Sequence, residues 1–290
     1  NARTEATLTS DIRSLWQETG STPPEFKALS GEHHYDVAII GGGYTGMSAA
    51  RYIAKQGLSP VILEANRIGW GASGRNGGVV SGKFRLSFAQ IAARHGIETA
   101  KTMHDLGLDA IEHVGALVED YAIADAEFRP TGSLRCAHTP KALDALVTEV
   151  GWLKNALGDT ACSILSSKAV AEETGSPDFV GGMLNTHGGI IHPLNFARGM
   201  ARGLNAAGIA VFEDSPVTGI RNDPQNVRVE TPDGLVIAQQ VVIATNSYSD
   251  LTPVGDSVRK SIIPFRSAMI ATERLAETLE KSLLAQDRSY

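Results

Sequence analysis

The stretch YDVAIIGGGYTGMSAARYIAKQGLSPVILE, residues 35–64, decides how this chain folds. Its residues 37–40 are apolar and are followed by glycine, a pattern typical of a strand that is buried on both faces in a parallel sheet. A glycine turn, a helical segment and a second apolar run follow in that order. The stretch therefore predicts a strand, a turn, a helix and a second, parallel strand.

The glycines of this stretch have the spacing of a phosphate-binding turn. Gly41, Gly43 and Gly46 form the pattern G-x-G-x-x-G, in which the glycines allow a tight turn, close approach of a pyrophosphate and close packing of the helix. Glu64 ends the second strand, where a carboxylate can accept hydrogen bonds from ribose hydroxyls. The unit predicts a site for an ADP-containing dinucleotide, whereas Glu64 alone would be interpreted as a solvated strand end.

The composition is that of a globular protein with one large or two ordinary domains, since 42% of the 290 residues are hydrophobic and 20% are charged. The net charge of −6 argues against nucleic acid or an anionic membrane as a partner. No apolar run is long enough to cross a bilayer and no signal peptide is recognised, so we expect a cytoplasmic protein. The histidines and cysteines lack ligand spacing, so we expect no metal, and buried thiols at Cys136 and Cys162.

A second glycine-rich segment, NRIGWGASGRNGGVVSG, occupies residues 66–82 directly after the strand that ends in Glu64. A segment with so few side chains is either a flexible linker or a backbone that lies flat against a ligand. Its position after the predicted ribose-binding strand favours the second interpretation.

The rest of the chain alternates between two patterns. Apolar periodicity predicts helices at 9–18, 88–121 and 140–157, with a hairpin at 128–137. From Gly188 the strand and helix pattern returns, with a helix at 193–207 and strands at 210–213, 226–230 and 235–245. Residues 262–273 are predicted to be a strand that returns to the inserted part. We therefore expect two interleaved domains.

Four segments together resemble the FAD-dependent oxidoreductases of the D-amino-acid oxidase and glycine oxidase superfamily, and most of all its gamma-glutamylputrescine oxidase-like branch. They are DVAIIGGGYTGMSAARYIAKQG, LEANRIGWGASGRNGG, GGIIHPLNFARGMA and VVIATNSY. The resemblance implies an α/β fold in which a Rossmann-like FAD-binding domain of the glutathione-reductase type is interleaved with an α+β substrate domain. Family members are longer, so we expect the C-terminal part to be missing from this chain.

The implied domain limits are an N-terminal helix and linker at 1–34, an FAD-binding domain at 35–83 and 188–255, and an incomplete substrate domain at 84–187 and 256–290.

The resemblance also implies contacts with the cofactor. It places the amides of Tyr44 and Thr45 over the pyrophosphate, residues 75–79 near the isoalloxazine ring, and the backbone of Val217 against adenine. Val217 alone would be interpreted as a core residue. The implied FAD-binding residues are Gly41, Gly43, Tyr44, Thr45, Gly46, Glu64, Ala65, Ala72, Ser73, Arg75, Asn76, Gly77, Gly78, Val79, Val217, Ala244 and Thr245.

The implied reaction is oxidation of the carbon–nitrogen bond of a small amine or amino acid. A hydride passes from the substrate to flavin, water hydrolyses the imine, and molecular oxygen reoxidises the flavin with release of hydrogen peroxide. Arg75 and Asn76 are candidates for polar groups near the ring, with a structural role in the loop as the alternative. Lys260 is a candidate for assisting oxygen, with a solvated lysine as the alternative. Two other functions stay open, namely a flavin dehydrogenase with another electron acceptor and a catalytically silent FAD-binding fragment.

Overall fold

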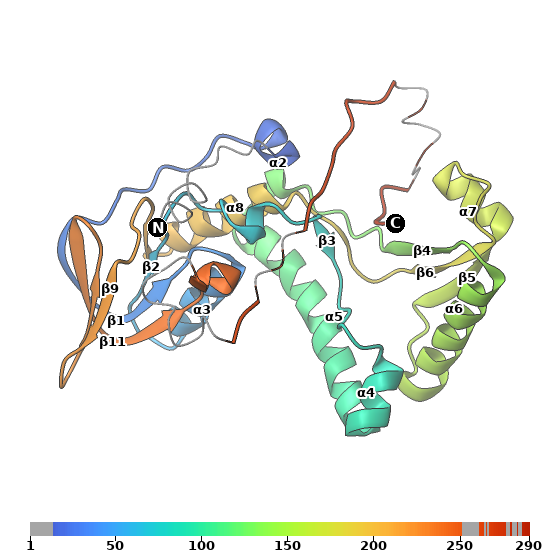
Figure 1. Ribbon diagram of the computed structural model, residues 1–290, viewed down its shortest axis with the longest axis horizontal. Coiled ribbons are helices and arrows are strands. Elements are labelled where there is room, and N and C mark those ends of the chain that lie inside the picture. Colours follow the sequence, from blue (N-terminus) through green and yellow to red (C-terminus); the bar gives the residue numbers. More distant parts are fainter. Residues whose placement is uncertain are drawn as a thin grey trace. The chain divides into compact units, whose positions relative to one another are not determined.

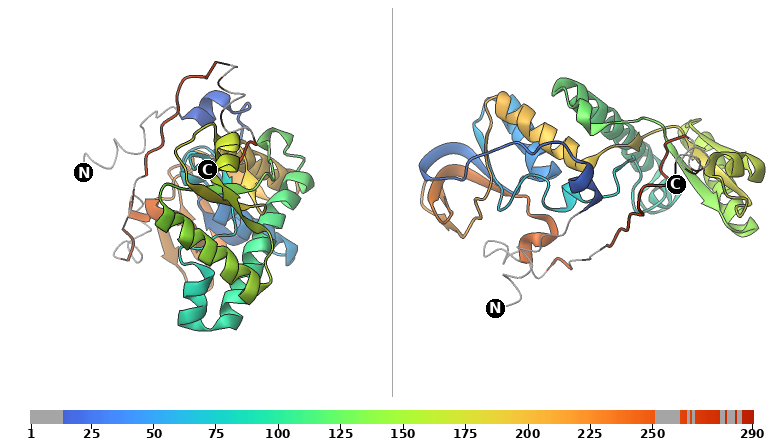
Figure 2. Two further views of the ribbon diagram at one scale, coloured as in Figure 1. Left: turned by 90° about the vertical axis from the view of Figure 1, so that its right-hand side faces the viewer. Right: turned by 90° about the horizontal axis from the view of Figure 1, so that it is seen from above.

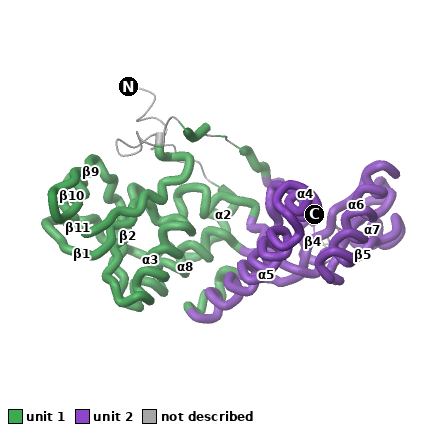
Figure 3. The backbone as a smooth tube through the Cα atoms, turned by 90° about the horizontal axis from the view of Figure 1, so that it is seen from below, with its two compact units in different colours: residues 1–77, 121–126, 192–270 green, residues 78–120, 127–191, 271–290 purple. Residues whose placement is uncertain are grey.

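The computed structural model describes residues 14–250, 261–263, 265, 267–276, 279, 283 and 286–290. The chain forms two compact units, shown in different colours in Figure 3. Unit 1 draws its described residues from Asn1–Gly77, Tyr121–Ala126 and His192–Ile270, and unit 2 from Gly78–Asp120, Glu127–Ile191 and Ala271–Tyr290. Both units are discontinuous in sequence. The assignment of one domain to FAD and of the other to substrate stays a prediction.

Unit 1 is built on a six-stranded sheet in the order β8-β2-β1-β11-β10-β9. Strands β8 (Ala210–Phe212), β2 (Pro60–Leu63), β1 (Gly31–Ile40) and β11 (Gly234–Ile243) run parallel. Strands β10 (Val227–Glu230) and β9 (Gly219–Asn222) extend the sheet in antiparallel fashion. Helices α3 (Tyr44–Lys55) and α8 (Pro193–Ala206) pack against each other and against the parallel strands (Figure 1). The strand, turn, helix and strand predicted for residues 35–64 are confirmed.

The core explains why this stretch folds as it does. Residues 37–40 of β1 and all four residues of β2 are buried, as expected for central strands covered on both faces. In the register of the sheet Ile40 pairs with both Leu63 and Ile243, so three parallel strands end at one level. The main chain stays paired just beyond this level, since the Ala244 N–H donates to the Ile40 carbonyl at 2.8 Å. The carboxyl ends of β1, β2 and β11 therefore meet at one edge.

Unit 2 combines a small antiparallel sheet with helices. Its sheet has the order β4-β6-β5, and helices α6 and α7 pack against it (Figure 1 and Figure 2). The bounds are β3 (Val79–Val80), α4 (Phe88–His95), α5 (Ile97–Asp120), β4 (Ser133–Ala137), α6 (Pro140–Trp152), the π-turn η3 (Leu153–Leu157), β5 (Cys162–Ser166), α7 (Ser167–Thr174), β6 (Gly181–Asn185) and β7 (Gly189–Ile190). Cys162 lies in the core of this unit, and Cys136 is half-buried.

Three predictions about secondary structure need correction. The helix expected at 88–121 is two helices, because Gly96 adopts a φ of +88° and ends α4. The hairpin expected at 128–137 is absent, because β4 pairs with β6 and not with a strand just before it. The described residues within 262–273 include no strand.

The remaining short elements all belong to unit 1. They are α2 (Leu15–Thr19) and the 3₁₀ turns η1 (Ala72–Gly74), η2 (Ala124–Ala126) and η4 (Asn246–Asp250). The helix expected at 9–18 is thus seen only from Leu15, and residues 1–13 lie outside the described part of the chain. Among the helices that the structure describes, none is long and apolar enough to span a membrane.

Candidate FAD-binding site

A cavity of about 260 Å³ opens at the carboxyl ends of β1, β2 and β11 in unit 1. This is the edge where open α/β sheets bind their ligands. Of the predicted FAD-binding residues, eleven line the cavity, namely Gly41, Gly43, Tyr44, Thr45, Glu64, Ala65, Ala72, Ser73, Val217, Ala244 and Thr245. The structure thus brings together five separate runs of the sequence, within residues 40–45, 63–66, 69–73, 216–218 and 244–248.

The glycine turn, residues 41–46, has the backbone that its sequence predicts. Gly41 has a φ of +108°, and a Cβ there would lie 2.6 Å from the Ala244 carbonyl oxygen. A Cβ on Gly46 would overlap the Gly41 carbonyl oxygen, so Gly46 lets α3 pack against the turn without itself lining the cavity. Gly43 is the N-cap of α3, and Gly43, Tyr44 and Thr45 line the cavity, so the first turn of the helix faces it.

Tyr44 connects this turn to the neighbouring elements. Its N–H donates to the Ser73 hydroxyl at 3.0 Å, and its own hydroxyl donates to the Pro193 carbonyl at 3.0 Å. Burial raises the pKa of Tyr44 to about 12, so the phenol stays protonated and keeps this donor. The start of α3 is therefore fixed both to the second glycine-rich segment and to the start of α8.

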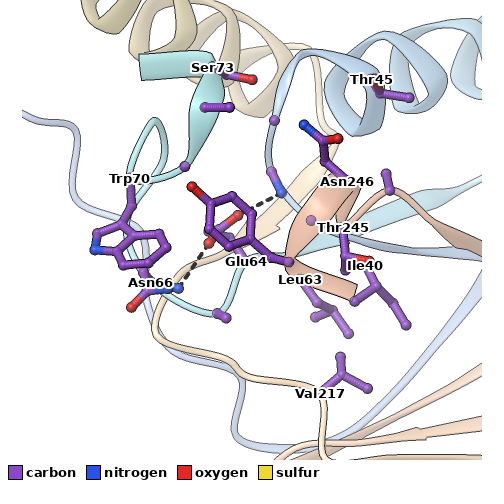
Figure 4. Close-up of a pocket in the computed structure, with 18 of the residues that line it drawn as sticks. Ile40, Thr45, Leu63, Glu64, Asn66, Trp70, Ser73, Val217, Thr245 and Asn246 are labelled. Atoms are coloured by element: carbon purple, nitrogen blue, oxygen red, sulfur yellow. Dashed lines mark hydrogen bonds between the residues drawn. The ribbon is translucent and has the colours of Figure 1, made fainter. Parts of the chain in front are cut away.

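Glu64 is not a solvated strand end. One carboxylate oxygen accepts the Gly42 N–H at 2.8 Å and the other accepts the Asn66 N–H at 3.0 Å (Figure 4). Burial raises the pKa of this carboxyl, the two N–H groups oppose the rise, and the carboxylate of Glu213 adds to it. Glu64 therefore holds the glycine turn and the start of the next loop together at the cavity wall, which sequence analysis did not foresee.

Val217 is both a core residue and a residue of the cavity wall. It is 6% exposed and belongs to the core cluster that also contains Val61 and Leu63, and it lines the cavity as well. Its predicted backbone contact with adenine stays a prediction.

The second glycine-rich segment lines the cavity only with its first half. Residues 69–73 reach it, and Arg75, Asn76 and Gly77 do not. The Asn76 amide donates to the Ser73 and Ala72 carbonyls at 2.9 and 3.3 Å, and the Arg75 guanidinium carbon lies 4.8 Å from the Trp70 ring centroid. These contacts favour the structural alternative for both side chains.

Three predicted residues are not tested by the geometry of this cavity. Gly78 and Val79 belong to unit 2, and their contact with the cofactor stays a prediction. Lys260 lies outside the described residues.

Sequence analysis missed an aromatic wall. Trp70 and Tyr248 line the cavity with ring centroids 5.6 Å apart, and a Cβ on Gly71 would lie 3.2 Å from the Tyr248 ring. Figure 4 shows Trp70 and Asn66 on one side of Glu64, with Thr245 and Asn246 on the other. The motifs containing Trp70 and Tyr248 were recognised, but a motif does not reveal which way a ring points.

Comparison with known proteins gives the class of protein that this fold and cavity define. The family described as FAD dependent oxidoreductase (DAO) matches residues 36–289, and the chain belongs to this family. Gamma-glutamylputrescine oxidoreductase of Escherichia coli (strain K12) is 34% identical over 285 residues, which are 97% of this chain and 65% of that protein. The chain therefore spans about two thirds of the length of this relative.

More distant relatives share the fold. Glycine oxidase of Geobacillus kaustophilus (strain HTA426) is 22% identical over 89% of this chain and 67% of its own length. The solved structure of L-amino acid deaminase from Proteus myxofaciens superposes with a TM-score of 0.64 at 23% identity, covering 80% of this chain and 50% of that chain. The predicted fold and the resemblance to this family are confirmed.

FAD is the cofactor that the family implies, and the residues present fit it. The turn at Gly41 has no room for a side chain, the first turn of α3 opens towards the cavity, and a carboxylate stands beside it. These are the groups that a pyrophosphate and a ribose need.

Proposed function

We propose that this chain forms the FAD-binding part of an oxidoreductase that oxidises the carbon–nitrogen bond of an amine or amino acid, with imine hydrolysis and release of hydrogen peroxide. The observation that carries the proposal is the cavity at the ends of β1 and β2, where Glu64 and the open first turn of α3 stand together. Support for an amine or amino-acid substrate comes from the relatives, whose names include a gamma-glutamylputrescine oxidoreductase and a glycine oxidase. A cytoplasmic location stays a prediction from the sequence.

In this proposal the residues of the chain bind FAD and orient it. When bound, FAD supplies the acceptor for the hydride. Glu64 accepts hydrogen bonds from the adenosine ribose, in addition to those from Gly42 and Asn66. The N-terminus of α3 favours the negative charge of the pyrophosphate. Trp70, Tyr248 and Val217 give the cavity apolar surface that contacts the bound dinucleotide.

The experiment is addition of candidate amines and amino acids to the purified gene product that contains this chain, with and without oxygen. Bleaching of the flavin absorbance together with peroxide release in air is the expected result. Bleaching without peroxide would instead favour a dehydrogenase that uses another electron acceptor. A yellow protein that no amine or amino acid bleaches would contradict the proposal and favour a silent FAD-binding fragment.

A further inference from the structure

Helix α2 (Leu15–Thr19) lies outside every motif discussed so far, yet it is tightly held in unit 1. A helix of five residues is too short to persist by itself in water. Its start is capped by Ser14 and Gln17, whose side chains each accept the backbone N–H of the other residue, at 3.3 and 2.8 Å. Since none of its residues is fully buried, long-range polar contacts must fix it.

The first of these contacts joins α2 to the second glycine-rich segment. The indole N–H of Trp16 donates to the Asn76 carbonyl at 2.9 Å, across 60 residues of sequence. The side chain of Asn76 is fixed locally, because its amide donates to the Ser73 and Ala72 carbonyls. The side chain of Asn76 is therefore held by local partners, and its main-chain carbonyl is held by a distant one, Trp16.

His192 forms the second contact. Its Nδ1 accepts the Asn195 N–H at 3.2 Å as the N-cap of α8, so this nitrogen carries no proton. The proton is then on Nε2, which donates to the Thr19 hydroxyl at 3.1 Å, and the Thr19 hydroxyl donates to the Leu15 carbonyl at 2.8 Å. The ring of His192 also meets the Trp16 ring edge to face, with centroids 4.9 Å apart. Trp16 is thus oriented by the buried first turn of α8.

The exit of α2 is fixed to the same helix. The Ser21 N–H donates to the Asn195 side-chain oxygen at 2.9 Å, and the Arg198 guanidinium donates to the Ser21 carbonyl at 2.8 Å. Residues 14–21 therefore form a brace, fixed to α8 at one end and to the Asn76 carbonyl through the indole of Trp16.

We propose that Trp16 is a positioning residue for the cofactor loop, residues 72–77, which it orients through the Asn76 carbonyl. This inference rests on the proposed function and on the prediction, made from the family resemblance, that residues 75–79 pass near the isoalloxazine ring. Gly77 has no side chain that could fix its peptide, so the orientation of this stretch depends on the partners of Asn76. Loss of the indole N–H leaves a part-buried carbonyl without this donor and lets the peptide turn.

The test is Trp16→Phe in the full gene product, because phenylalanine keeps an aromatic ring beside His192 and removes only the N–H. We expect the Kd for FAD to rise about threefold to tenfold, as for loss of one neutral hydrogen bond. The visible absorption bands of the bound flavin should shift, since the loop beside the ring changes. Thr19→Val, which removes the hydroxyl that orients His192, should act in the same direction with a smaller effect.

Leu15→Ala is the matched control, because Leu15 is on the same helix and is 49% exposed. It should leave FAD affinity and the flavin spectrum unchanged. If Trp16→Phe binds FAD with unchanged affinity and spectrum, the proposal is wrong, whether or not the variant melts at a lower temperature.

Amide hydrogen exchange in the FAD-free protein separates this inference from the proposed function. Exchange at residues 72–77 should be faster in Trp16→Phe than in Leu15→Ala, even if the protein turns out not to oxidise amines. Equal exchange in the two variants would overturn the role of Trp16, and a wild-type protein without affinity for FAD would overturn the proposed function instead.

Discussion

The glycine turn at residues 41–46 and the cofactor loop at residues 72–77 are fixed in different ways. The start of the turn is held by the main chain of the sheet, since the Gly41 N–H donates to the Leu63 carbonyl at 2.9 Å and a Cβ on Gly41 would lie against backbone atoms of Ala244 and Thr245. The Glu64 side chain adds one bond, from the Gly42 N–H. The loop has short-range backbone bonds of its own, and its last residues also depend on two side chains, those of Trp16 and Asn76. The difference teaches that the turn depends mainly on its own glycines and the adjoining sheet, whereas the loop also depends on a residue far away in the sequence, Trp16.

The largest effect should come from the turn. Gly46→Val places a branched side chain against the Gly41 carbonyl and Ile39, and backbone atoms cannot move aside cheaply. We expect the free energy of unfolding to fall by roughly 1–3 kcal/mol and FAD binding to be lost. Denaturant unfolding measures the first and a titration the second. Gly151→Ala is the control, because a Cβ at Gly151 meets nothing within 4 Å, and it should be neutral or stabilising.

A substitution in the loop should separate binding from folding. Gly77→Val adds a branched side chain where the loop is predicted to lie against the flavin ring, so flavin content should fall while the apoprotein unfolds at nearly its normal temperature. Absorbance at the flavin band and thermal unfolding are the two measurements. Full flavin content in the variant would show that the loop does not lie on the cofactor.

Glu64 links the two regions, so its replacement should affect both. Glu64→Leu removes the acceptor of the Gly42 and Asn66 N–H groups as well as the proposed ribose contact. We expect at least about a tenfold rise in the Kd for FAD, and a loss of about 1 kcal/mol from the free energy of unfolding of the apoprotein. Asp214→Asn is the control for the loss of one negative charge, since the Asp214 side chain is 59% exposed. Equal FAD affinity in wild type and Glu64→Leu would contradict the ribose contact.

The smallest effect is the pH dependence of FAD binding. The pKa of the Glu64 carboxyl is raised in the free protein by burial, and ribose hydroxyls that donate to the ionised form would lower this pKa in the complex. Affinity should therefore be full above the pKa of the free protein and should fall as the pH drops through it. Titrations across the acidic range measure this, with Glu64→Leu as the flat reference. If the affinity of the wild type for FAD rises as the pH drops, the prediction is wrong.

What the sequence could predict follows from the same comparison. The strand, turn and helix at residues 35–64 were predictable because Gly41 and Gly46 each satisfy a local need, a positive φ in one case and close packing in the other. The hydrogen bond from Trp16 to Asn76 and the position of Trp70 in the cavity wall were not foreseen, because a distant hydrogen-bond acceptor and the direction of a ring leave no trace in a local pattern. For the same reason the partner of β4, which begins 44 residues after β4 ends, was missed.

The central claim is that the cavity beside Glu64 holds the adenosine end of FAD. The most direct measurement is identification of the nucleotide released on heating the purified gene product, by its absorbance and chromatographic mobility against known standards. The account predicts a yellow protein that releases FAD, because the proposed partner of the Glu64 carboxylate is an adenosine ribose, which FMN lacks. Release of FMN, or of NAD in place of any flavin, would contradict it.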